Sequence, residues 1–157
     1  MTTVLIRAAR GDDASWAARL MASSDPWITL GRGYEACLAA CTSTLDLLDI
    51  AEISSERCGL VLVRPAGVAG APYIVSIAVA PAYRSRGVGA ALLAHVERTY
   101  RGRSRHLFLC VSSFNPRARA FYERHGFAAV GTLEAFLIDG ADEILMHKRL
   151  TAEVPKL

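Results

Sequence analysis

The 157-residue sequence predicts an α/β or α+β protein with one central sheet. Segments of continuous or alternating apolar residues, typical of strands, occur in both halves of the chain. Between them lie segments with apolar residues every three or four positions, as on one face of a helix. The elements follow the order β-α-α-β-β-β-α-β-α-β-β, which combines neighbouring antiparallel strands with helical crossovers. We therefore expect a mixed sheet flanked by helices.

Length and composition favour one soluble domain that spans residues 1–157. Apolar residues make up 52% of the chain and charged residues 21%, a balance typical of a folded globular protein. Apolar runs end well before the ~18 residues that a membrane span needs. Charged residues follow the start of the chain too soon for a secretory signal. We expect a cytoplasmic protein without a membrane partner.

Charge and cysteine spacing give little support to a nucleic-acid or metal-binding protein. The formal net charge is +3, which is modest for a protein that binds nucleic acid. The four cysteines have no C-x-x-C spacing, although Cys37 and Cys41 lie one helical turn apart and could share a metal. Small, buried, reduced side chains are the simpler interpretation, so we expect no metal.

The first 80 residues are predicted to contain four strands and two helices. We expect a helix capped by residues 11–13 and ending near Met21, since Trp16 and Leu20 lie one turn apart. A second helix is expected over 33–40. The predicted strands cover 3–9, 46–53, 58–65 and 73–80, and the predicted turns cover 54–56 and 66–72.

The second half alternates helices and strands. A helix is expected from about Arg86 to Tyr100, because apolar residues recur there every four positions. A continuous apolar strand follows at 106–112. Asn115 as N-cap, Pro116 at the first helical position and Gly126 just past the end delimit another helix. The last strands are predicted at 127–138 and 142–150.

The stretch VAPAYRSRGVGAALL, residues 79–93, joins a strand to a helix with two arginines and two glycines. The start of a helix presents unpaired N–H groups and the positive end of its dipole, so this junction predicts an anion site. A P-loop is excluded because no Lys-Ser/Thr pair follows. The dinucleotide fingerprint is excluded because Leu92 stands where its third glycine would be.

A second motif follows the strand at 106–112, where Asn115 opens a helix that carries Phe121-Tyr122-Glu123 and ends in Gly126-Phe127. In the first motif Arg84, Gly87 and Gly89 occupy the fixed places of the pattern Q/R-x-x-G-x-G/A. Together the two motifs resemble those of the GNAT superfamily of acetyl-CoA-dependent N-acetyltransferases, most firmly over residues 73–150. The resemblance implies a mostly antiparallel mixed sheet that splays between its fourth and fifth strands.

The resemblance also implies where acetyl-CoA, the cosubstrate, would bind. Its pantetheine would pair with the strand at 73–80, and its pyrophosphate would lie on the amides of residues 86–90. Asn115 would touch the cosubstrate as well as cap its helix. The cosubstrate-binding residues implied are Ile77, Ala78, Val79, Arg84, Ser85, Arg86, Gly87, Val88, Gly89, Ala90, Asn115, Ala118, Phe121 and Tyr122.

Tyr122 is the expected catalytic residue. By the resemblance it would act as general acid toward the leaving thiolate, while a primary amine attacks the thioester directly. A tyrosine pKa near ~10 suits a thiol pKa near ~8.5. The alternative is that Tyr122 is a core aromatic residue beside Phe121.

The general base is harder to assign. Relatives carry a glutamate at the positions of Tyr73 or Cys110, and neither residue here is a carboxylate. The alternatives are a water relay or a carboxylate from the N-terminal half, for which the candidates are Asp25, Glu35 and Glu52. An acetyl-Cys110 intermediate is disfavoured, because an apolar strand raises a thiol pKa.

The acceptor would be a small-molecule or peptide amine bound near residues 23–34, where Asp25, Trp27 and Tyr34 offer a carboxylate and two aromatic walls. Two alternative functions stay open: a non-catalytic acetyl-CoA-binding module, and an acetyltransferase of aminoacyl-tRNA, suggested by the basic run at 98–106. Otherwise we expect no nucleic-acid partner. The apolar segment at 133–138 could line a homodimer or a substrate pocket.

Overall fold

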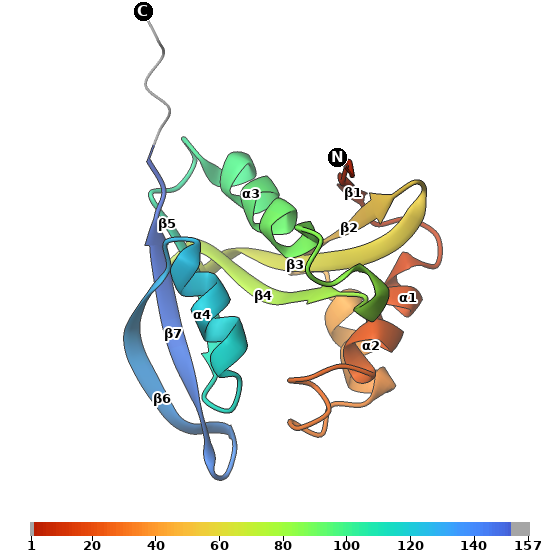
Figure 1. Ribbon diagram of the computed structural model, residues 1–157. Helices are drawn as coiled ribbons and strands as arrows, with labels where there is room; N and C mark the ends of the chain where they lie inside the picture. The colour runs from red at the N-terminus through yellow and green to blue at the C-terminus, as the bar shows by residue number, and fades with distance from the viewer. Residues whose placement is uncertain (1, 152–157) are drawn as a thin grey trace, which may run out of the picture.

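In the computed structural model, which describes residues 2–151, seven strands form one sheet flanked by four α-helices (Figure 1). The predicted order of elements is confirmed. The elements are β1 (Leu5–Ala8), α1 (Asp13–Ala22), α2 (Tyr34–Cys41), β2 (Leu47–Ile53), β3 (Glu56–Val68), β4 (Ala71–Val79), a 3₁₀ turn (Pro81–Tyr83), α3 (Val88–Tyr100), β5 (His106–Ser112), α4 (Pro116–Arg124), β6 (Ala128–Ile138) and β7 (Ala141–Arg149).

The sheet has the strand order β1-β2-β3-β4-β5-β7-β6, and β4 and β5 form a parallel pair while the other neighbours are antiparallel. The pairing of β4 with β5 is confined to Tyr73 opposite Phe108 and Ile74 opposite Leu109. Beyond these residues β4 continues to Val79 and β5 to Ser112 without pairing to each other. The splay between the fourth and fifth strands is therefore confirmed.

A β-bulge in β4 lies where the splay begins. Leu62 of β3 is opposite Ser76, but the next residue, Val63, is opposite Ile74, so Val75 is an extra residue on β4. A bulge bends its strand and interrupts regular pairing. The bulge thus directs β4 away from β5 immediately after their last shared pair.

Two apolar clusters hold the helices on opposite faces of the sheet. Val61 and Val63 of β3 belong to the larger cluster, which α3 and α4 cover. Leu60 and Leu62 belong to the second cluster, which α1 and α2 cover. Successive strand residues point to opposite faces. Figure 1 shows α3 crossing β2 to β4, whereas α1 and α2 lie at the end of the sheet remote from β6.

The predicted turn at 66–72 is wrong. β3 extends to Val68, and the chain reverses at Ala69-Gly70, both with positive φ (49° and 82°). Two such residues form the tight turn that suits a hairpin. The predicted strand ended at residue 65, but the strand continues past Pro65, since its pairing is irregular between Arg64 and Val68, where a missing N–H is tolerated.

The helix starts differ from the predictions by one or two residues. The helix α3 begins at Val88 rather than Arg86, because Gly87 adopts the left-handed conformation (φ 81°) as N-cap. In α1 the N-cap Asp12 makes no side-chain cap hydrogen bond. In α4 the predicted cap is confirmed, since Asn115 Oδ1 accepts a hydrogen bond from the Ala118 amide at 3.2 Å.

Asp13 links the start of α1 to the sheet. Its carboxylate accepts hydrogen bonds from Arg7 Nη1 (2.6 Å), the Arg10 amide (2.9 Å) and Arg57 Nη1 (3.0 Å). Burial alone would raise the pKa of Asp13, but these hydrogen bonds outweigh it and lower the pKa from 3.8 to about 2. A lowered folded-state pKa stabilises the protein above pH 3.8, and this stabilisation is lost as the pH falls toward 2.

Asp13→Asn should therefore remove part of the acid sensitivity of folding. Between pH 5 and pH 2 the wild type should lose about 2 kcal/mol more unfolding free energy than the variant. Urea unfolding at each pH measures this difference. Asp12→Asn, at a carboxylate with 73% of its side chain exposed, is the matched control and should keep the wild-type profile. An unchanged acid profile in Asp13→Asn would contradict the assignment.

Candidate functional site

The splay leaves part of the edge of β4 unpaired inside the sheet. The Ala80 amide donates to Cys58 O on β3 at 2.8 Å. Because amides of alternate strand residues point to opposite edges, those of Ile77 and Val79 point away from β3 and into the splay. Arg84 Nε donates to Val79 O at 3.2 Å, which agrees with this orientation. Ile77 and Val79 can therefore pair with an extended ligand.

The N-terminus of α3 lies directly after this edge. The first helical hydrogen bond runs from the Ala91 amide to Gly87 O at 3.0 Å, so the amides of residues 88–90 have no partner within the helix. A Cβ at Gly87 would meet nothing within 4 Å, so its positive φ is the feature that requires glycine. The geometry provides a cradle of N–H groups at the positive end of a helix dipole, which suits an anionic phosphate.

Gly89 serves a different purpose from Gly87. A Cβ on Gly89 would lie 3.1 Å from Phe121 Cζ, closer than most real contacts of this kind. The missing side chain lets α4 place Phe121 against the first turn of α3. Both motifs that the sequence singled out are thereby brought to one place, with Asn115 and Ala118 at the start of α4.

The arginines of the junction are held by its own residues. Arg84 binds the backbone of Val79, and the Arg86 guanidinium lies over the Tyr83 ring at 5.6 Å. Ser85 between them has a positive φ of 62°. The loop therefore keeps two cations next to the unpaired amides of α3.

Tyr122 lies on the buried side of α4 and is 8% exposed. Its ring contacts those of Phe121 and Phe127 at centroid distances of 5.4 and 6.0 Å. Burial raises the pKa of Tyr122, so the hydroxyl keeps its proton at neutral pH. Within residues 2–151 no fully buried side-chain oxygen lacks a hydrogen-bond partner. The Tyr122 carbonyl accepts from the amides of His125 (3.0 Å) and Phe127 (3.1 Å), but its hydroxyl makes no hydrogen bond in these residues. Its hydroxyl must therefore reach solvent at one point.

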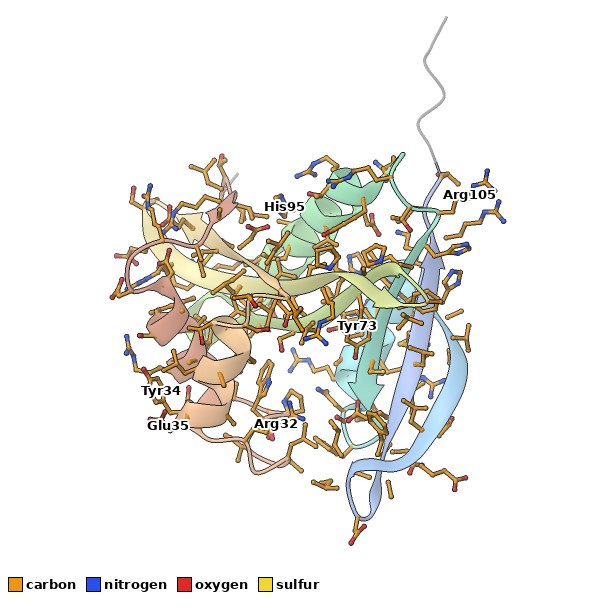
Figure 2. All side chains as sticks on the ribbon, turned by 180° about the vertical axis from the view of Figure 1, so that it is seen from behind. Arg32, Tyr34, Glu35, Tyr73, His95 and Arg105 are labelled. Carbon is orange, nitrogen blue, oxygen red and sulfur yellow. The ribbon has the colours of Figure 1, made fainter. Side chains whose placement is uncertain are left out.

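The opposite face of the splay carries a second group of polar side chains. Tyr73 is opposite Phe108 in the first of the two shared pairs, and Cys110 and Ser112 follow Phe108 on the same face of β5. Glu143 of β7 is opposite Ser112, whose Oγ donates to Glu143 Oε1 at 2.6 Å. Figure 2 shows Tyr73 on this face.

Gly67 makes room for Tyr73. A Cβ at Gly67 would lie 2.4 Å from Tyr73 Cβ, a separation that real side chains do not tolerate. The irregular end of the β3–β4 hairpin therefore brings its own backbone against the Tyr73 side chain. Gly67 fell within the predicted turn, so its part in placing Tyr73 was missed.

The surroundings of Cys110 disfavour a reactive thiol. Burial raises the pKa of Cys110, and the charge of Glu143 raises it further, although Tyr73 opposes them. Burial also raises the pKa of Tyr73, and Cys110 and Glu143 add to this shift. Cys110 is thus a protonated thiol near neutral pH and a poor nucleophile.

Glu143 is the residue that sequence reasoning missed. The search for a base considered positions on β4 and β5 and carboxylates of the N-terminal half. Glu143 is on β7, and only the pairing with Ser112 brings it to the splay. The signal in the sequence was a carboxylate near the start of the apolar strand DEILM. In the structure Glu143 is 5% exposed.

The residues predicted to bind the acceptor lie on α2 and the loop before it. Trp27 is 7% exposed in the second apolar cluster. Asp25 Oδ1 accepts hydrogen bonds from the Thr29 amide (3.1 Å) and hydroxyl (2.6 Å). In Figure 2 Tyr34 points from α2 away from Tyr73, whereas Arg32 lies on the Tyr73 side. Trp27 and Tyr34 both belong to the second apolar cluster, and the role of Asp25, Trp27 and Tyr34 in binding the acceptor stays a prediction.

The remaining base candidates have other surroundings. Glu52 pairs with Arg7 Nη2 at 2.5 Å, and its strand β2 is separated from β5 by β3 and β4. Glu35 lies beside Tyr34 on the outer side of α2 (Figure 2). Across the described residues no group of three metal-ligating side chains gathers, and no helix is long and apolar enough to cross a bilayer.

Comparisons with known proteins agree with this geometry. The model of the acetyltransferase (GNAT) family matches residues 15–127, more than half of the chain. No curated protein matches the sequence. Among solved structures, one assigned to the GNAT acetyltransferases from Desulfovibrio desulfuricans has a TM-score of 0.79 and 26% identity, covering 95% of this chain and all of its own.

Two further solved structures share the fold at lower identity. The ribosomal-protein-S18-alanine N-acetyltransferase of Escherichia coli has a TM-score of 0.75 and 20% identity, with 99% of both chains covered. A GNAT family acetyltransferase of Elizabethkingia anophelis with acetyl-CoA bound has a TM-score of 0.71 and 19% identity, covering 94% of this chain and 98% of its own.

The left-handed conformation of Gly87 can be tested by substitution. Gly87→Ala should lower the unfolding free energy by about 1–2 kcal/mol, because only the backbone conformation is strained. Gly87→Asn should lose less, since asparagine tolerates this conformation better. Urea unfolding measures both. Equal stability of Gly87→Ala and the wild type would show that residue 87 does not hold a positive φ in solution.

Proposed function

This chain belongs to the GNAT family of acetyltransferases, and on that premise we propose that it acetylates a primary amine by direct attack on acetyl-CoA. The observation that carries the proposal is the splay of β4 from β5, which leaves strand amides unpaired next to a helix N-terminus. One ligand with an extended amide-containing arm and a pyrophosphate fits both features. Acetyl-CoA has both and supplies an activated acetyl group.

The residues of the chain fit this cosubstrate. Ile77 and Val79 would pair with the pantetheine amides, with Ala78 between them turned toward β3. The amides of Val88, Gly89 and Ala90 would hold the pyrophosphate, and Arg84, Ser85, Arg86 and Gly87 would complete the cradle. Asn115, Ala118 and Phe121 would border it from α4.

Tyr122 would donate the proton that the leaving thiolate needs. Its pKa is raised by burial, so it is protonated whenever the thioester is attacked. Its hydroxyl reaches solvent at one point although the ring is buried. A donor that is held by aromatic contacts and open at its polar end is well placed for general acid catalysis.

Direct attack is favoured over an acetyl-enzyme intermediate by the state of Cys110. Its pKa is raised, chiefly by burial, which keeps the thiol protonated. We propose that the acceptor is a small-molecule or peptide amine and that it binds on the face of the splay that carries Tyr73. The proposed enzyme works in the cytoplasm as one domain over residues 1–157.

Tyr122→Phe should lower kcat for thiol release about a hundredfold or more and leave coenzyme A affinity within about twofold. Thiol release with a panel of primary amines measures the first quantity, and calorimetry with coenzyme A measures the second. Tyr100→Phe removes a hydroxyl from a similarly buried tyrosine of α3 and should retain wild-type turnover.

Two results would contradict the proposed function. Absence of calorimetric heat with coenzyme A would contradict the assignment of acetyl-CoA as cosubstrate. Equal kcat in Tyr122→Phe and the wild type would contradict the assignment of Tyr122 as general acid.

A further inference from the structure

Glu143 is a buried carboxylate without a cation. Its residue is 5% exposed, and within residues 2–151 no lysine, arginine or histidine forms an ion pair with it. Buried charges in proteins are normally paired, because an uncompensated one is expensive to remove from water. The arrangement indicates that a cation from outside the described residues completes it.

In the described part of the chain, only one side-chain oxygen of Glu143 has a hydrogen-bond partner. Oε1 accepts the hydrogen bond from Ser112 Oγ at 2.6 Å, and Oε2 has no hydrogen-bond partner in the described residues. No fully buried side-chain oxygen of the described residues lacks a hydrogen-bond partner, so Oε2 must be open to solvent. The carboxylate is thus fixed by Ser112 through one oxygen and open at the other.

Among the described residues, the polar groups around Glu143 include no cation that pairs with it. On β5 and β4 its polar neighbours are Ser112, Cys110 and Tyr73, all uncharged near neutral pH. Leu133 of β6 is opposite Glu143, and Leu145 follows it on the same face of β7. These apolar neighbours limit screening by water, so attraction to a cation is stronger here than at the surface.

Arg64, the cation opposite Tyr73 on β3, is already paired. Arg64 of β3, opposite Tyr73, makes two hydrogen bonds to Asp46, at 2.7 Å from Nε and 3.1 Å from Nη2. Arg64 therefore does not neutralise Glu143. A single positive group entering from solvent on the Tyr73 face would find one open carboxylate oxygen beside an aromatic ring, a combination that favours an alkylammonium ion.

We propose that Glu143 is the acceptor-amine subsite: its Oε2 binds the ammonium group of the incoming primary amine and takes one proton from it. This inference rests on the proposed function. Glu143 replaces the glutamates that relatives carry at the positions of Tyr73 and Cys110. Ser112 is the positioning residue that orients the carboxylate.

In the proposed reaction, one proton passes in total from the ammonium group of the acceptor to water. Glu143 takes a proton from R–NH₃⁺ and leaves the amine with a free electron pair. That pair forms the new C–N bond to the acetyl carbon, and the C–S bond breaks with its electrons on sulfur. Tyr122 protonates the sulfur and recovers a proton from the nitrogen of the new amide. Glu143 then returns its proton to water.

Glu143→Gln tests the assignment, with Glu134→Gln on the same hairpin as matched control, because Glu134 is exposed. At pH 7 the Glu143→Gln variant should lose about a hundredfold or more of kcat/KM. The defect should shrink as the pH approaches ~10, where an alkyl amine loses its proton without a base. The control should follow the wild type at every pH.

A binding measurement separates this inference from the proposed function. Calorimetry with butylammonium chloride, with and without coenzyme A, should give heat in the wild type and in Glu134→Gln and none in Glu143→Gln. Coenzyme A should bind all three proteins equally. Equal butylammonium heats in all three, or an activity loss in Glu143→Gln that is the same at every pH, would overturn the role of Glu143. A failure of coenzyme A to bind would overturn the proposed function alone.

Discussion

The architecture depends on the separation of β4 from β5 after Ile74. The two strands share only two residue pairs, and the bulge at Val75 directs β4 away immediately afterwards. Side-chain packing holds the two halves together where the backbone ladder ends. Ile77 and Val79 of β4 pack on the same apolar cluster as Leu109 and Val111 of β5, beneath α3. The sheet therefore stays one unit while part of its backbone remains available to a ligand.

The same separation divides the chemistry between two faces. On the α3–α4 side, helix amides and arginines attract anions, and Phe121 and Tyr122 border them. On the other side, Tyr73 and Glu143 form a polar group with one open carboxylate oxygen. An anionic carrier and a cationic acceptor would thus approach the gap from opposite faces, each attracted by fixed charges or dipoles of the opposite sign.

Sequence patterns predicted the order of elements because apolar periodicity and helix punctuation are local. Asn115, Pro116 and Gly126 delimited α4 correctly. The turn at 66–72 was wrong because tertiary packing keeps a proline- and glycine-containing segment in the hairpin. Glu143 could not be found because Ser112, its partner on β5, is 31 residues away in the chain. Register follows from strand pairing, which no local pattern specifies.

Amide hydrogen exchange of β4, resolved by residue, tests the central claim most directly. The amides of Ile77 and Val79 point into the splay, whereas those of Ala78 and Ala80 point toward β3. Adding coenzyme A should slow exchange at 77 and 79 and at the first turn of α3, and should change 78 and 80 little. Unchanged exchange at 77 and 79 in the presence of saturating coenzyme A would contradict the account.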